Sequence, residues 1–174
     1  MKTHTLLPLL AAGLMLAGCQ TTPKVNNGVT ATDITINFQE PDRFTDAAED
    51  LGGGASEHVL NSLRDYLKEQ APRYLQTGQK LAVTFTDIDL AGDIPPNARA
   101  ASQDVRVIRA IYVPRQTLTF TLTDASGAVL KEGKRTLSNL NFQLDSINPR
   151  SQSESFYYDK QLLNTWLRDE FKQG

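Results

Sequence analysis

Hydrophobic and polar residues alternate along three stretches of this chain, and a period of two predicts β-strands. The first stretch is DITINF, residues 33–38, and the second is LAVTFT, residues 81–86. The third, TLTFTLTD at residues 117–124, places leucine and phenylalanine on one face and threonine on the other. Each of these strands is therefore expected to be buried on one face only.

Two further segments are expected to be extended, although neither alternates as cleanly. DASG, residues 124–127, has the composition of a hairpin turn, so AVLKEGKRTL at residues 128–137 should return as the partner of the third strand. Lys131 and Lys134 are typical of an edge strand, where charge opposes pairing with other chains. DVRVIRAIYV, residues 104–113, is rich in β-branched residues and is also expected to be extended.

Apolar residues recur at helical spacing in two segments, which predicts two amphipathic helices. The first helix begins after Ser56, a favourable N-cap, and ends or kinks at Pro72. The second begins near Phe156, and its apolar face consists of Leu162, Leu163, Trp166, Leu167 and Phe171. Its polar face is expected to point to water and consists of Asp159, Lys160, Asn164, Arg168 and Glu170.

Two amphipathic helices can cover one face of a sheet of about four strands. The sequence therefore predicts an α+β fold, a two-layer α/β sandwich whose sheet is mostly antiparallel, in a single domain at residues 33–174. Trp166 is the only tryptophan and falls on the apolar stripe of the second helix. It is expected to dock on three apolar residues of the third strand, namely Leu118, Phe120 and Leu122.

The first 18 residues have the layout of a secretory signal peptide. Lys2 supplies the positive charge, and the apolar run at residues 6–16 is far shorter than the about 20 residues that a membrane span needs. The run ends in Leu16-Ala17-Gly18-Cys19, which resembles the lipobox of bacterial lipoproteins. That resemblance implies removal of residues 1–18 and two or three acyl chains, palmitate among them, on Cys19.

Residues 19–32 are polar and contain proline, asparagine and glycine, so they are expected to form a flexible tether that spans on the order of 20 Å. Gln20 stands where an aspartate commonly holds lipoproteins at the inner membrane. The resemblance therefore implies sorting to the outer membrane, with the domain facing the periplasm. Cys19 is the only cysteine, so no disulfide is expected despite the oxidising compartment.

The charge balance limits the classes of partner that this chain is expected to bind. The chain has 18 Lys and Arg against 20 Asp and Glu, and loss of Lys2 with the signal peptide leaves 17 against 20, a net charge of −3. This mildly acidic balance disfavours nucleic acid and anionic membrane surfaces. The expected partners are the membrane, through the lipid on Cys19, and an envelope protein whose identity the sequence does not give.

Carboxylates cluster in TDIDLAGD, residues 86–93. Asp87 and Asp89 are two residues apart and would point to the same side of a strand, where they could bind a cation, share a proton or face water. With Asp93 they partly match a calcium loop, but the match fails at Ala91 and at Ala98, where a bidentate glutamate is needed. A solvated strand end, a metal role and carboxylate catalysis are therefore the three readings.

Three arginines form the second candidate cluster, namely Arg106, Arg109 and Arg115. They lie close in sequence to Tyr112, and arginine beside an aromatic residue can bind a carboxylate or phosphate. The same arginines could instead pair with Asp87 and Asp89 across the sheet. The sequence favours internal pairing or solvation for this cluster.

Other catalytic motifs are weak. His58 is the only histidine left after removal of the signal peptide, no Gly-x-Ser-x-Gly motif is present, and the glycines at 52–54 lack the Lys-Ser/Thr of a phosphate-binding loop. One histidine without a free thiol does not indicate a zinc site. The sequence therefore predicts no catalytic residue, no metal and no cofactor.

Four motifs together resemble a known family: DIDLAG at 87–92, VPRQTLTFTL at 113–122, GAVLKEGKRTLSNLNF at 127–142 and YYDKQLLNTWLRDEF at 157–171. They look like the proteobacterial envelope proteins catalogued as domain of unknown function 3016, over about residues 33–172. The resemblance implies a secreted or lipid-anchored domain and transfers no catalytic residue.

The function that follows is a non-catalytic binding or accessory module of the cell envelope, anchored at the outer membrane. The alternative is an envelope hydrolase or a calcium-dependent module that uses Asp87 and Asp89.

Overall fold

The computed structural model describes residues 32–50, 54–95, 106–144 and 154–172. Its sheet has four strands, which are β1 (Asp33–Phe38), β2 (Lys80–Asp89), β3 (Arg115–Thr123) and β4 (Val129–Ser138). They lie in the order β1-β2-β3-β4, with β1 parallel to β2 and the other two pairs antiparallel. The predicted four-stranded, mostly antiparallel sheet is confirmed, and β4 is an edge strand as expected.

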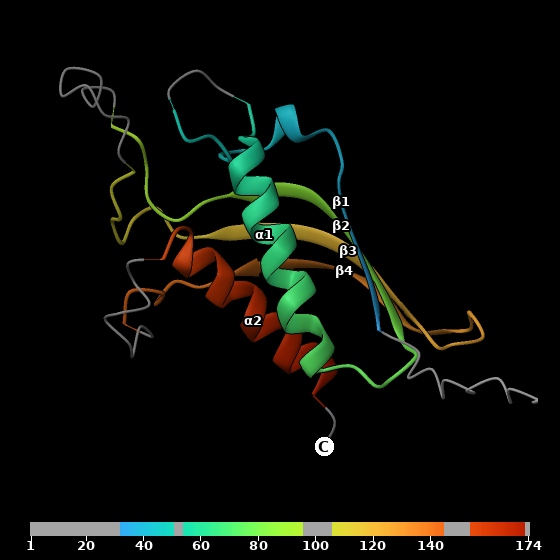
Figure 1. Cartoon of the computed structure of the whole chain (residues 1–174). Coiled ribbons are helices and arrows are strands. Elements are labelled where there is room, and N and C mark those ends of the chain that lie inside the picture. The colour runs from blue at the N-terminus through green and yellow to red at the C-terminus, as the bar shows by residue number, and fades with distance from the viewer. Residues whose placement is uncertain (1–31, 51–53, 96–105, 145–153, 173–174) are drawn as a thin grey trace, which may run out of the picture.

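Two helices, α1 (Glu57–Gln70) and α2 (Tyr157–Phe171), pack side by side on one face of this sheet (Figure 1). Two short 3-10 turns complete the regular structure, η1 (Pro41–Arg43) and η2 (Ala71–Arg73). The predicted two-layer α+β sandwich is therefore confirmed. Within the described residues, neither helix is long and apolar enough to cross a membrane.

The register of the strands explains why one face is buried. The apolar residues of β2 lie opposite those of β3, in the pairs Leu81–Leu122, Val83–Phe120 and Phe85–Leu118. All six belong to the core beneath the helices. The alternate positions carry mainly threonine, whose branched side chain suits the open face of a sheet.

The C-terminal half of α2 closes the core. Trp166 is 5% exposed, and its ring lies edge-on to Phe120 at 5.7 Å and to Phe171 at 5.5 Å. Such aromatic pairs add to the free energy gained from burial alone. The predicted docking of Trp166 beside Phe120 is confirmed.

The start and end of α1 follow the sequence signals. The hydroxyl of Ser56 accepts a hydrogen bond from the backbone N–H of His58 at 3.2 Å, which is the predicted N-cap. The helix ends at Gln70, and Pro72 follows within η2. Proline cannot continue the helical hydrogen bonding, so the predicted stop is also confirmed.

The predicted extended segment at residues 104–113 is wrong for its described part, 106–113. Only Val107 pairs as in a sheet, through two backbone hydrogen bonds to Asp93, and a turn follows between Arg109 and Tyr112. Both sides of β2 are already occupied by β1 and β3, so this β-prone segment can pair only beyond the end of that strand. It therefore forms a loop at one end of the sheet.

Candidate functional site

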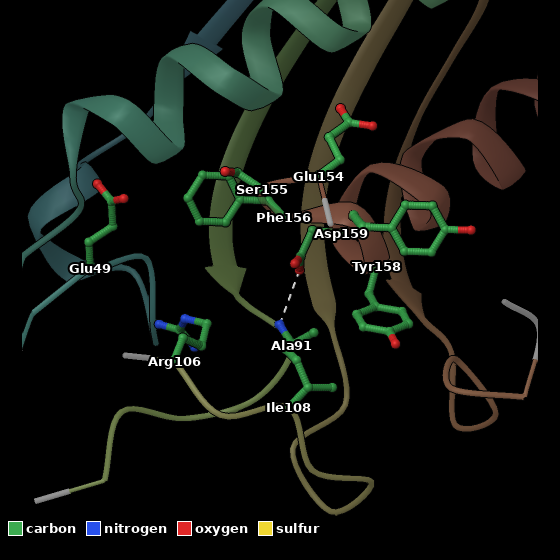
Figure 2. A pocket seen from close by; sticks show the side chains of 10 residues that line it. Glu49, Ala91, Arg106, Ile108, Glu154, Ser155, Phe156, Tyr158 and Asp159 are labelled. Atoms are coloured by element: carbon green, nitrogen blue, oxygen red, sulfur yellow. Dashed lines mark hydrogen bonds between the residues drawn. The ribbon is translucent and has the colours of Figure 1, made fainter. Parts of the chain in front are cut away.

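A cavity of about 370 Å³ lies where β2 ends and α2 begins. Its walls come from the turn after β2, the loop at 106–108 and the first turn of α2, and Figure 2 shows these side chains converging. Residues that line it include Arg106, Ile108, Phe156, Tyr157, Tyr158 and Asp159.

Asp159 is the buried polar group of this cavity, with only 2% of its surface exposed. Its carboxylate accepts a hydrogen bond from the backbone N–H of Ala91 at 3.2 Å (Figure 2). Its backbone carbonyl accepts one from the side-chain amide of Gln116 at 3.3 Å, so strand β3 also fixes its position. The helix begins after Phe156, which has a left-handed backbone (φ 58°) and no side-chain cap.

The protonation of Asp159 follows from its burial. Removal from water raises the pKa of its carboxyl from 3.8 to about 7, and a nearby Asp46 carboxylate also raises it. The Ala91 hydrogen bond and the positive charge of Arg106 lower the pKa, but burial outweighs them. Within the described part of the chain, no lysine or arginine forms an ion pair with Asp159.

Arg106 lies at the edge of the cavity but is already saturated with partners. Its guanidinium donates two hydrogen bonds of 2.8 Å to the carboxylate of Asp46, and others to the carbonyl oxygens of Gly92 and Ala48. A bidentate pair of this kind is strong and geometrically specific. Arg106 therefore clamps two loops together, and its charge is matched by Asp46.

A second polar group lies at the rim. Glu49 accepts hydrogen bonds from the hydroxyl of Ser56 and from Nδ1 of His58, the latter at 2.7 Å. Burial tends to raise the pKa of Glu49, but these hydrogen bonds outweigh it and the pKa is lowered. The hydroxyl of Ser56 donates to Glu49 and not to the imidazole of His58, so the three groups do not form the Ser–His–acid order of a catalytic triad.

Aromatic rings form the side of the cavity contributed by α2. The rings of Tyr157 and Tyr158 lie 5.3 Å apart, and Tyr158 also contacts Phe142 edge-on at 4.8 Å. Phe156 contacts the ring of His58 at 5.5 Å. Three consecutive aromatic residues at the start of α2 thus line the cavity.

The carboxylates predicted as a patch have different hydrogen-bond partners, although the charges of Asp87, Arg106 and Arg115 all act on Asp89. Asp87 accepts hydrogen bonds from the backbone N–H and the hydroxyl of Thr45, at 2.8 and 3.0 Å, beside a separate polar cavity of about 320 Å³. Asp89 lies opposite Arg115 in the sheet. Burial and the Asp46 charge raise the pKa of Asp89, while Arg115 opposes them.

Each arginine of the predicted patch lies near a carboxylate. Arg109 reaches Asp93 with 3.8 Å between Nε and Oδ1, while Arg106 alone enters the cavity of Asp159. Internal pairing of the arginines is therefore what the structure shows, although the partner of Arg106 is Asp46. In the four described ranges, no three His, Cys, Asp or Glu side chains are grouped so as to hold a metal ion.

Sequence reasoning missed Asp159 because helical spacing places it on the polar face of α2. That expectation is wrong for Asp159 and Lys160, which are 2% and 8% exposed, and for Glu170, whose side chain is 9% exposed. Each is covered by a segment distant in sequence, such as Ala91 for Asp159. An acidic residue in the first turn of a helix is common and gives no local signal of burial.

The family model described as "Protein of unknown function (DUF3016)" matches residues 32–169. No curated protein matches the sequence. Among solved structures, a PelC dodecamer from Paraburkholderia phytofirmans is similar at 11% identity, covering 84% of this chain and 89% of that one, with a TM-score of 0.43. A minor lipoprotein from Acinetobacter baumannii is similar at 10% identity, covering 80% and 89%, with a TM-score of 0.29. Similarity at this level indicates no shared function.

Proposed function

We propose that this chain, which belongs to the family described as protein of unknown function (DUF3016), is a lipid-anchored binding module of the cell envelope and not an enzyme. The observation that carries the proposal is the sequence Leu16-Ala17-Gly18-Cys19 after a charged and apolar leader. These residues lie outside the described ranges. Their order is the one that lipid attachment to a cysteine requires.

The orientation of the domain supports a binding role. The tether joins the domain at Asp33, which pairs with Lys80 at the start of β2, whereas the cavity of Asp159 lies beyond the other end of that strand. A ten-residue strand is about 33 Å long. The cavity therefore opens far from the point of attachment, where it can meet a ligand in the periplasm.

The contacts within the cavity favour binding over catalysis. Arg106 is held by Asp46, and Ser56 and His58 both bind Glu49. Asp87 and Asp89, the residues of the rival hydrolase or calcium-dependent module, have different partners and do not share one cavity. Separate partners for these two carboxylates are what a non-catalytic domain predicts.

Substitution of Cys19 tests the anchor. We expect wild-type protein in the membrane fraction, with an intact mass that fits the chain from residue 19 plus its acyl chains. Cys19→Ser removes the acyl acceptor and should leave an uncleaved or non-acylated form. An unmodified Cys19 in the wild type would contradict the proposal, and Thr21→Ser serves as a matched control in the same segment.

The position after the cysteine tests the sorting to the outer membrane. Gln20→Asp should move the protein toward the inner-membrane fraction of a density gradient, with Gln20→Asn as the uncharged control. Equal distributions of wild type and Gln20→Asp would show that this position does not direct the protein to the outer membrane.

A further inference from the structure

We propose that the cavity of Asp159 binds a small organic cation, an ammonium group on a compact apolar body. In this arrangement Asp159 is the counter-ion and the aromatic residues at the start of α2 form a wall of the site. The inference rests on the proposed binding role of the domain and names the class of its ligand.

The charges around the cavity favour a cation. Arg106 is the cationic side chain among the lining residues, and its bidentate pair with Asp46 matches its charge. Lys160, in the same turn as Asp159, is directed to Glu154, with 2.6 Å between Nζ and Oε1. Asp159 and Glu49 therefore face the cavity as carboxyl groups without a lysine or arginine partner in the described residues. An anionic ligand would meet repulsion here.

Burial makes the carboxyl of Asp159 the strongest attachment point. A charge that is removed from water is stabilised mainly by an opposite charge, and in the described residues Asp159 has backbone N–H donors and the charge of the nearby Arg106, which is itself paired with Asp46, but no ion-pair partner of its own. The cavity is about 370 Å³, large enough for a small ligand to reach this group. A bound ammonium would complete the ion pair that the fold leaves incomplete.

The aromatic wall suits the same ligand. Phe156, Tyr157 and Tyr158 line the cavity, and a cation is attracted to the face of an aromatic ring. Ile108 adds apolar surface from the facing loop. A carboxylate combined with aromatic rings is the arrangement that recognises quaternary and primary ammonium groups, whereas a neutral sugar would leave the carboxylate unpaired.

The protonation of Asp159 provides a second readout. Since burial raises its pKa to about 7, a cation should bind mainly to the ionised form, and its affinity should rise about tenfold between pH 6 and pH 8. The other charged or titratable groups around Asp159 come from residues 46–49, the 106–108 loop, α1, the residue Glu154 before α2, and α2 itself. They are Asp46, Glu49, Arg106, His58, Glu154, Tyr157, Tyr158 and Lys160. The variants below separate the contribution of Asp159 from that of His58, which hydrogen-bonds Glu49 at the rim.

Calorimetric titration of the purified full chain in dodecylmaltoside tests the inference. The probes are choline and its uncharged isostere 3,3-dimethylbutan-1-ol, with calcium chloride as a third ligand. We expect choline to bind at pH 8 at least tenfold more tightly than the isostere, and Asp159→Asn to lower its affinity at least tenfold. Glu170→Gln changes a partly buried carboxylate of the same helix, far from the cavity lining, and should leave the affinity of choline unchanged.

Two further variants keep the test decisive. Tyr158→Leu preserves apolar volume and should weaken choline several-fold, even if Asp159→Asn were to disturb folding. His58→Gln should leave the rise of affinity with pH in place if Asp159 causes it.

Equal affinities for choline and the isostere, no binding of choline, or binding of calcium alone would each overturn the inference. Because the titration does not depend on acylation of Cys19, its failure is distinguishable from failure of the proposed anchor.

Discussion

Helix α2 carries a carboxylate near each end, the buried Asp159 and the partly buried Glu170, and their partners differ. Near the C-terminal end, Glu170 receives two hydrogen bonds from the guanidinium of Arg135, at 2.8 and 2.9 Å, and an ion pair of 2.7 Å from Lys131. In the first turn, the carboxylate of Asp159 accepts a hydrogen bond from the backbone N–H of Ala91 and has no ion-pair partner among the described residues. The pKa of Glu170 is lowered, chiefly by Arg135, whereas burial raises the pKa of Asp159 to about 7.

This difference separates a structural charge from a candidate functional one. Glu170 binds the edge strand β4 to α2 and lies beside the aromatic cluster that contains Trp166. Asp159 costs free energy when it ionises, and the charge of Arg106 and the backbone N–H donors offset only part of that cost. A buried carboxylate without an ion-pair partner in the described residues, beside a cavity, is a candidate ligand-binding group.

The largest expected loss of stability comes from a substitution near the C-terminal end of α2, where Glu170 is paired with Arg135 and Lys131. Trp166→Ala removes a ring that packs on Phe120 and Phe171, and should lower the free energy of unfolding by about 3–5 kcal/mol. Chemical denaturation monitored by circular dichroism measures this loss of stability. Tyr158→Ala, at the cavity end, is the control and should cost less than half as much. Equal losses of stability in Trp166→Ala and Tyr158→Ala would contradict the proposed difference between the two ends of α2.

The second prediction is a gain of stability on substitution of Asp159. Because Asp159 has a folded pKa above its ordinary value of 3.8, its ionisation opposes folding, and the wild type should lose stability as pH rises from about 4 to about 7. Asp159→Asn should abolish this loss and raise the free energy of unfolding at pH 8 by up to about 4 kcal/mol. Denaturation at pH 5 and pH 8 tests it, and a destabilised variant at pH 8 would show that Asp159 is compensated after all.

The smallest effect concerns Glu170. Its pKa in the folded protein lies below the ordinary value of 4.5. Its contribution to the free energy of unfolding is therefore complete above pH 4.5 and is lost as the pH falls through the folded pKa. Glu170→Gln should destabilise the protein at pH 7 by less than half the effect of Trp166→Ala, since Arg135 and Lys131 are partly exposed. The difference from wild type should shrink toward pH 3. If the difference in free energy of unfolding between wild type and Glu170→Gln stayed constant from pH 7 to pH 3, the charge of Glu170 would make no contribution to stability.

Most of the fold was predictable because its signals are local. The alternation in β3, the N-cap at Ser56 and the apolar stripe that contains Trp166 each depend on residues within a few positions of one another. These patterns are sufficient for a sheet covered by two helices. The loop at 106–113 was not predictable, because its β-prone residues cannot join a strand whose two neighbours are already in place.

The candidate site depends on contacts between distant segments. Asp159 and Ala91 are 68 residues apart, and Arg106 and Asp46 are 60 apart. Helical spacing places Trp166 on the apolar face of α2 and Asp159 and Glu170 on the polar face. It does not show whether another segment of the chain covers that polar face. Burial of the other side is decided by a loop and by the edge strand β4.

The most direct test of the contrast within α2 is an NMR titration of the carboxyl carbons of Asp159 and Glu170 in the same sample. The account predicts a midpoint near 7 for Asp159 and one below 4.5 for Glu170. Saturation with choline should lower the midpoint of Asp159 and leave that of Glu170 unchanged. A midpoint near 3.8 for Asp159 in the free protein, or one that choline does not move, would contradict the account.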